Sequence, residues 1–231
     1  AARDFTAGAD EIMVSDGHGA CGAYNCIFEE LEAGAEYLFG SPRGQYAQGC
    51  DEATDLAFAI AYHGMAGAHP AVLDHTQSSR GIVEIRMNDR VLGELGLFAA
   101  VVGHFGIAVG LVTGDDATCD EARQLLGEDN VVTAQVKRAL SRSAAICLAP
   151  ADARALIEDK AREAVERADE FEPFVIQPPV TLRVQMLRTE QMEGYRRRAD
   201  RDERFTMLDS RTVEIVCENA LQAMNMYVGY E

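Results

Sequence analysis

The chain has 231 residues, and its 38 acidic against 21 basic side chains give a net charge of −17. So acidic a chain argues against binding a nucleic-acid backbone or an anionic membrane surface, since both need clustered positive charge. Hydrophobic residues make up 48% of the sequence, enough for one substantial core, and no apolar run approaches the ~18 residues of a membrane span.

The first residues predict the tail of a helix that ends at Gly8, followed by a strand over residues 11–15. An α/β protein usually opens on a strand. We therefore expect a first β-unit to precede Ala1 in the complete protein. The strand runs into a polar, glycine-rich loop, Ser15-Asp16-Gly17-His18-Gly19.

Three further strands are predicted in the first half. Residues 55–62 form an almost continuous apolar run, typical of a strand covered on both faces in a parallel sheet. Residues 81–87 alternate between apolar and polar, which is the period of a strand with one solvent-exposed face. A buried helix is expected from Gly93, and residues 107–113 read as another buried strand.

The second half is expected to be richer in helix. Caps at Asp116 and Thr133 and a first-turn proline at Pro150 favour helices there. The predicted elements are helices over 117–126, 133–147 and about 150–171, a strand over 180–186, and a closing helix over 211–227.

Alternating strands and helices predict an α/β fold with a mainly parallel central sheet flanked by helices. Pro173, Pro178 and Pro179 mark the expected boundary. We predict an α/β domain over 1–172 that holds a metal site, and a smaller strand–helix portion over 173–231.

Six cysteines are spread along the chain, at positions 21, 26, 50, 119, 147 and 217. Cys147 and Cys217 stand in apolar surroundings that read as helical, so free buried thiols are favoured over a disulfide framework. This usage predicts a cytoplasmic protein.

The candidate functional residues follow predicted strands. His18 and His63 stand in glycine-bordered loops, where parallel sheets usually bind ligands. Glu94 begins an apolar helix, so it either pairs with a metal or simply complements the helix dipole, and its position alone favours neither. Structural roles are preferred for three other residues: a loop position for His69, a helix C-terminus for His104, and a helix cap for Asp116.

The order of these motifs resembles the zinc D-aminopeptidase family of dipeptide-transport operons. The resemblance extends from the first residues to the final helix and is carried by Ser15-Asp16-Gly17-His18-Gly19, Ala61-Tyr62-His63, His75, Asn88-Asp89-Arg90 with Gly93-Glu94-Leu95-Gly96, Gly114-Asp115-Asp116 and Ser141-Arg142-Ser143-Ala144. It implies a two-zinc enzyme that hydrolyses short peptides or amides with an N-terminal D-amino acid. His18, His63 and Glu94 would be metal ligands, and His75 the catalytic histidine.

One motif of that family is missing from the sequence. The family draws its remaining ligands from an Asp-x-Glu-Gly motif at the end of its first strand, and no such motif occurs here. We expect it in a segment that precedes Ala1. A degenerate, non-catalytic binding or assembly protein remains an alternative, as does an amidase or L-specific peptidase on the same scaffold.

The partners expected are short D-aminoacyl peptides and further copies of this chain, with neither nucleic acid nor membrane. The resemblance implies a ring whose sites face an enclosed space. An apolar, methionine-rich face on the closing helix, formed by Met224, Met226 and Val228, is consistent with such a contact. Packing of this helix on its own sheet is the competing interpretation.

Overall fold

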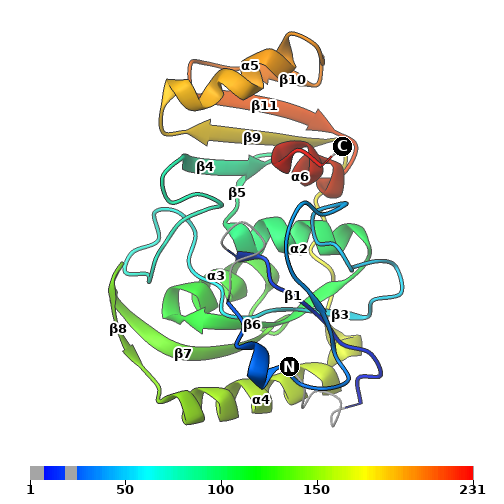
Figure 1. The fold of residues 1–231 in the computed structure, drawn as a ribbon, viewed down its shortest axis with the longest axis vertical. Coiled ribbons are helices and arrows are strands. Elements are labelled where there is room, and N and C mark those ends of the chain that lie inside the picture. The colour runs from blue at the N-terminus through cyan, green and yellow to red at the C-terminus, as the bar shows by residue number, and fades with distance from the viewer. Residues whose placement is uncertain (1–7, 19–24, 231) are drawn as a thin grey trace.

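The computed structural model describes residues 8–18 and 25–230, which form a four-stranded sheet, a five-stranded sheet, a two-stranded parallel sheet of β1 and β2, and the helices around them (Figure 1). The strands are β1 Met13–Ser15, β2 Glu36–Leu38, β3 Leu56–Ala59, β4 Ile82–Met87, β5 Arg90–Val91, β6 Ala108–Asp115, β7 Val132–Ser141, β8 Ala144–Cys147, β9 Val180–Met186, β10 Phe205–Met207 and β11 Thr212–Cys217. The α-helices are α2 Glu94–His104, α3 Asp116–Leu126, α4 Pro150–Glu166, α5 Glu193–Ala199 and α6 Ala220–Val228.

A four-stranded sheet with the order β3-β6-β7-β8 forms the lower part of the molecule in Figure 1. β3, β6 and β7 are parallel, and β8 is antiparallel to β7. All eight residues of β6 are buried, because helices cover both faces of this strand. The prediction of an α/β fold with a mainly parallel central sheet is confirmed.

A second sheet, antiparallel with the order β10-β11-β9-β4-β5, forms the upper part. Helix α2 lies between the sheets, so it is apolar on more than one face. Leu95, Ala99 and Val102 pack with the core of the four-stranded sheet. Leu97, Ala100 and Val101 pack with the five-stranded one. Both sheets thus fix the position of Glu94, the first residue of α2.

The expected division at residues 172 and 173 stays a prediction. Strands β4 and β5 come from before this boundary and complete the sheet that β9, β10 and β11 form after it. The two portions therefore share a sheet as well as helix α2.

Two predicted helices are wrong. Residues 133–147 form the β7–β8 hairpin, because β7 pairs in parallel with the fully buried β6 and this pairing outweighs the helix propensity of an alanine-rich segment. Residues 211–227 divide into β11 and α6, with the Asn219 side chain capping the helix through a 2.8 Å bond from the amide of Gln222. Most of the helix expected over residues 1–9 lies outside the described residues.

The cysteines of the described residues are all free, namely Cys26, Cys50, Cys119, Cys147 and Cys217. Cys119 and Cys217 are buried, and burial raises the pKa of each thiol to about 11. Cys147 is exposed and ends a strand, so its expected burial in a helix is wrong. Cys21 lies outside the described residues.

The closing helix packs on its own sheet. Met224 is fully buried and Met226 is 8% exposed, both within the core of the five-stranded sheet, while Val228 is 36% exposed. The two methionines are therefore not available to another subunit, and the competing interpretation is correct for them. No helix of the described ranges is long and apolar enough to cross a bilayer.

Candidate metal centre

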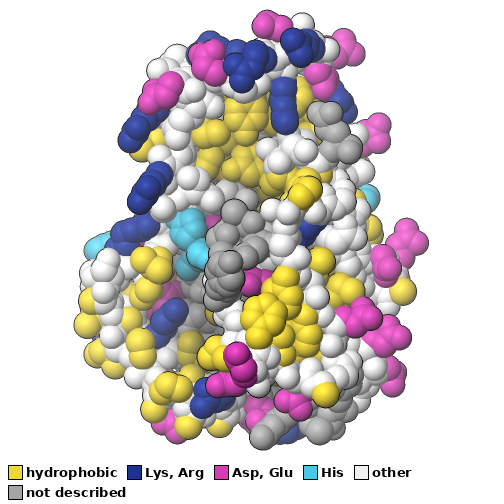
Figure 2. All heavy atoms as spheres, in the orientation of Figure 1, with side chains coloured by type: hydrophobic (Ala, Val, Ile, Leu, Met, Phe, Trp, Pro, Cys, Tyr) yellow, Lys and Arg dark blue, Asp and Glu magenta, His cyan; other side chains and the backbone are white. Residues whose placement is uncertain are grey.

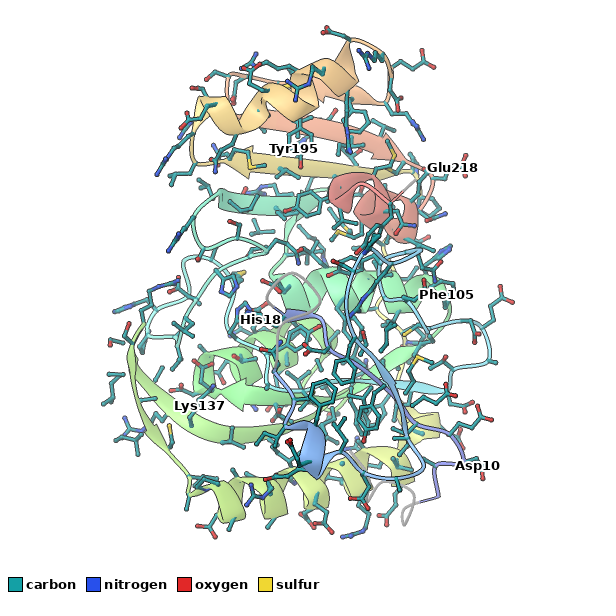
Figure 3. The ribbon with its side chains drawn as sticks, viewed as in Figure 1. Asp10, His18, Phe105, Lys137, Tyr195 and Glu218 are labelled. Carbon is teal, nitrogen blue, oxygen red and sulfur yellow. The ribbon has the colours of Figure 1, made fainter. Side chains whose placement is uncertain are left out.

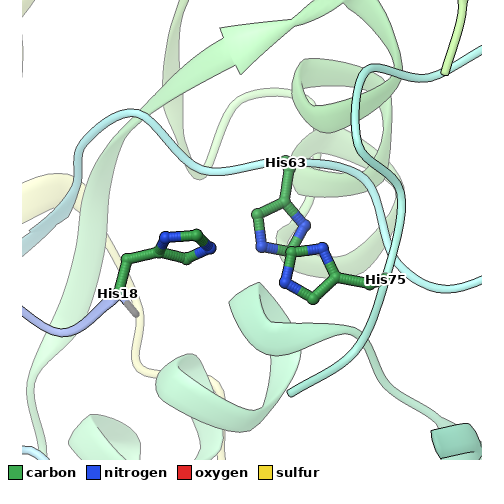
Figure 4. A group of neighbouring side chains, drawn as sticks. All are labelled: His18, His63 and His75. Atoms are coloured by element: carbon green, nitrogen blue, oxygen red, sulfur yellow. The ribbon is translucent and has the colours of Figure 1, made fainter. Parts of the chain in front are cut away.

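Three histidines that are far apart in the sequence converge on one point. One ligand nitrogen from each of His18, His63 and His75 lies within 4.8 Å of the other two. The rings of His63 and His75 stack with their centroids 3.9 Å apart, and the His18 ring stands edge-on to both (Figure 4). Histidine side chains reach the surface on the face shown in Figure 2, and Figure 3 places His18 in the middle of the molecule.

Three of the four residues at the site follow a strand or begin a helix. His18 comes three residues after the end of β1, and His63 comes four after β3. Glu94 is the first residue of α2, and His75 stands in the loop between His63 and β4. Strand ends and a helix start therefore bring together residues separated by up to 76 positions.

Glu94 lies against two of the three imidazoles. Its Oε1 atom is 3.4 Å from Nε2 of His63 and 3.4 Å from Nε2 of His75, and it accepts a 2.7 Å bond from the amide of Gln77. Two ligand atoms at ~2 Å from one zinc ion are at most ~4 Å apart. His63 and Glu94 are thus close enough to share an ion, and the ligand assignment stays a prediction.

Backbone carbonyls orient two of the rings. Nδ1 of His63 is 3.1 Å from the carbonyl oxygen of Gly64, and Nδ1 of His75 is 2.6 Å from that of Leu73. A carbonyl can only accept a hydrogen bond, so Nδ1 carries the proton in both rings. Each neutral ring therefore presents the lone pair of Nε2 to the site, as metal-binding and proton-accepting histidines do.

Burial and charge shift the pKa values of His63 and Glu94 in opposite directions. Burial lowers the pKa of His63, but the adjacent Glu94 carboxylate outweighs burial and the net shift is upward. Burial likewise raises the pKa of Glu94, but the contact with His63 outweighs it and the net shift is downward. Without a metal, the two therefore form an ion pair over a widened pH range.

These residues fit a divalent transition metal. Three imidazoles and a carboxylate are a donor set that zinc accepts, and a metal would replace the proton of His63 in contact with Glu94. Distance alone does not separate His75 from the expected ligands, because its Nε2 is as close to Glu94 as that of His63. Its expected catalytic role stays a prediction.

In the metal-free protein we expect the His63–Glu94 contact to stabilise the fold over a defined pH window. Because the pKa of His63 is higher in the folded protein than its usual 6.5, protonation of this ring stabilises the fold below pH 6.5. That stabilisation is lost as the pH rises through the pKa of the folded protein. Because the pKa of Glu94 is lower in the folded protein than its usual 4.5, ionisation of this carboxylate stabilises the fold above pH 4.5. That stabilisation is lost as the pH falls through the pKa of the folded protein. The Tm difference between chelator-treated wild type and Glu94→Gln should be largest between these values. A difference that does not vary with pH would contradict this.

Glu121 is a half-buried carboxylate beside the site that the sequence did not reveal. It lies on α3, and its Oε2 accepts a 2.8 Å bond from the amide of Met65 in the loop that carries His63. Burial raises its pKa, against the lowering effect of that bond. The same carboxylate touches Gly93: a Cβ there would lie 2.4 Å from Oε1 of Glu121 and 2.5 Å from Cβ of Met65. Gly93 is therefore needed for close approach, which holds the His63 loop against the start of α2.

Gly93→Ala should disturb this contact. We expect a loss of stability of ~1–3 kcal/mol, the usual cost of overpacking, together with weaker zinc binding as Glu94 moves relative to His63. Gly194→Ala is a matched control, because a Cβ at this exposed position in α5 meets nothing within 4 Å. Denaturant unfolding and zinc titration of both variants measure the effect. Equal behaviour of the two variants would contradict it.

The remaining candidates have structural positions. Asp115, not the expected Asp116, caps α3 by accepting a 2.9 Å bond from the amide of Thr118. Asp116 instead accepts a 2.8 Å bond from the amide of Ala139 in β7. His104 ends α2 as expected, and His69 stands in a loop.

Comparison with known proteins gives three findings. A family model described as Peptidase_M55, D-aminopeptidase, matches residues 1–228. A curated D-aminopeptidase from Bacillus subtilis (strain 168) is 35% identical over 179 residues, which cover 77% of this chain and 62% of the relative, so the chain spans less than two thirds of that relative's length. The solved structure of the Zn-dependent D-aminopeptidase DppA from Bacillus subtilis, described as a self-compartmentalizing protease, superposes with a TM-score of 0.88 at 29% identity over 99% of this chain and 81% of DppA.

Proposed function

This chain belongs to the Peptidase_M55 D-aminopeptidase family, and from that premise we propose that it is a zinc-dependent aminopeptidase acting on short peptides or amides with an N-terminal D-amino acid. The observation that carries the proposal is the convergence of three imidazoles, two of which lie against the Glu94 carboxylate. The activity and the zinc dependence of the Bacillus subtilis relatives support it.

His18, His63 and Glu94 are the proposed zinc ligands. Three protein ligands leave a position open, as catalytic zinc sites require. Zinc held by these residues would lower the pKa of a bound water towards ~7 and polarise a carbonyl oxygen. The second zinc ion implied by the family resemblance needs ligands beyond these residues.

His75 is the proposed catalytic histidine. Its Nδ1 proton is engaged by the Leu73 carbonyl at 2.6 Å, so the free Nε2 can take up a proton and return it. That nitrogen faces Glu94 at 3.4 Å, beside the proposed ligands. These contacts support the proposal that His75 transfers the proton when the amide bond breaks.

The proposed partner is a second copy of this chain. DppA is described as self-compartmentalizing, and apolar side chains stand exposed on and beside the β7–β8 hairpin, including Leu140 and Ile146 at 53% each and Leu148 at 43%. A closed ring with enclosed sites would admit short peptides only. Sedimentation tests this proposal, and a monomer at micromolar concentration would overturn it. We also propose a cytoplasmic location, supported by the free thiols.

The activity is tested with the full-length, zinc-loaded protein. D-Ala-D-Ala should be cleaved and L-Ala-L-Ala should not, and a chelator should abolish cleavage until zinc is restored. Preference for the L-peptide would overturn the stereospecificity. No cleavage of either peptide by a protein with zinc bound would overturn the proposed activity.

A further inference from the structure

The loop that carries His75 has a backbone that needs support. Leu73 and Gln77 have φ values of +53° and +59°, a left-handed conformation that is uncommon for residues other than glycine. Such a conformation persists only where the surroundings hold it. Glu94 holds the amide of Gln77, and further contacts to this loop come from the Gly-Asp-Asp and Ser-Arg-Ser-Ala motifs, to which the proposed chemistry assigns no role.

Asp115 holds the start of the loop. Its side chain is fully buried, and its Oδ2 accepts a 2.6 Å bond from the amide of Val72. The other oxygen accepts bonds from the amide and the hydroxyl of Thr118 at 2.9 and 2.6 Å. The loop is thus fastened to the first turn of α3.

Asp74 links the segment that follows His63 to the β7–β8 hairpin. Its Oδ2 accepts a 3.1 Å bond from the amide of Gly67, in the segment that follows His63. Its Oδ1 accepts a 2.5 Å bond from Nη1 of Arg142, at the turn of the β7–β8 hairpin. One carboxylate therefore joins the hairpin to the His63 loop across the residue that precedes His75.

Arg142 also bonds to the backbone of this loop. Its carbonyl oxygen accepts a 2.9 Å bond from the amide of Leu73, and its guanidinium also donates to the carbonyl of Asp74. Leu73 in turn supplies the carbonyl that receives the Nδ1 proton of His75. A continuous chain of hydrogen bonds thus runs from the hairpin turn to the imidazole.

We propose that Asp74 and Arg142 are positioning residues whose side-chain contacts fix the backbone of residues 73 and 74, and through it the ring orientation of His75. The catalytic consequence rests on the proposed function, whereas the effect on the ring does not. Orientation matters because a displacement of ~1 Å in a catalytic group can cost ~10²-fold in rate.

The test compares Arg142→Ala with Arg204→Ala in the full-length, zinc-loaded protein. Arg204 is a matched control: its side chain is 47% exposed against 46% for Arg142, and it pairs with Asp202 at 2.7 Å beside the five-stranded sheet. Long-range ¹H–¹⁵N spectra identify the His75 ring, and its hydrogen-bonded Nδ1 proton should be visible in wild type and in Arg204→Ala. In Arg142→Ala this signal should weaken or shift while bound zinc is retained.

Kinetics supply the second readout. Arg142→Ala should lower kcat on the order of 10–10²-fold with a smaller change in KM, and guanidinium ion should restore part of it. Arg142→Lys keeps the charge but loses the planar fork, so its kcat should fall between those of wild type and the alanine variant.

The outcomes are distinguishable. An unchanged His75 signal in Arg142→Ala overturns the proposal, as does loss of zinc in proportion to activity, which would mean that the whole metal site had collapsed. If wild type cleaves no peptide, the proposed function fails, but the His75 signal still decides whether Arg142 positions the ring.

Discussion

Replacing Glu94 with alanine should abolish hydrolysis and weaken zinc binding together. The carboxylate lies against two of the three imidazoles, with one oxygen 3.4 Å from both His63 Nε2 and His75 Nε2. Its removal takes away a proposed ligand and leaves the two imidazoles facing each other without a counter-charge. We expect kcat/KM to fall on the order of 10³-fold or more. Peptide assays and zinc content of the purified protein measure the two effects.

Glu128→Gln is the control for the loss of a carboxylate, since Glu128 is 78% exposed and lies 3.6 Å from Arg123, outside the site. It should keep both zinc and activity. Glu94→Gln adds a further comparison, because it keeps an acceptor for the Gln77 amide while removing the charge. Full zinc content in Glu94→Ala would show that the carboxylate is not a ligand.

His75→Ala should lower kcat by on the order of 10²–10⁴-fold while leaving zinc largely bound. The reason is the expected division of roles, in which His18, His63 and Glu94 hold the ion and His75 transfers a proton. Steady-state kinetics and metal analysis of the same preparation separate the two roles.

The structure makes this an informative experiment, because His75 lies as close to Glu94 as the proposed ligand His63 does. A loss of zinc equal to the loss of activity would mean that His75 is itself a ligand. His104→Ala is the control: this exposed histidine ends α2 and should change neither quantity.

Several elements could be predicted because their local pattern and their tertiary environment agree. The apolar run at β6 indicates a strand covered on both faces, and all of its residues are buried. The proline at the start of α4 and the alternation of β9 also stand where expected. In these segments no long-range contact opposes the local preference.

The errors occur where pairing outweighs propensity. The segment from Thr133 to Cys147 is rich in alanine and has a helical appearance, yet it forms a hairpin because β7 completes the parallel sheet beside β6. Strand β11 could not be distinguished from a helix in the sequence, since the apolar residues Val213 and Ile215 fit either a strand or a helix face. Short segments carry too little periodicity to decide between the two.

For the site, the candidate residues could be identified from the sequence: histidines in glycine-bordered loops, a glutamate at the start of an apolar helix, and the order of motifs that resembles one family. The tertiary structure alone decided the geometry. Asp74 and Arg142 are 68 residues apart, and Met65 and Glu121 are 56 apart, so no local pattern reports that they touch. Hydrogen bonds form between groups brought together by the packing of α2, α3 and the two sheets, and only that packing determines which carboxylates lie at the site and which ones hold its loops in place.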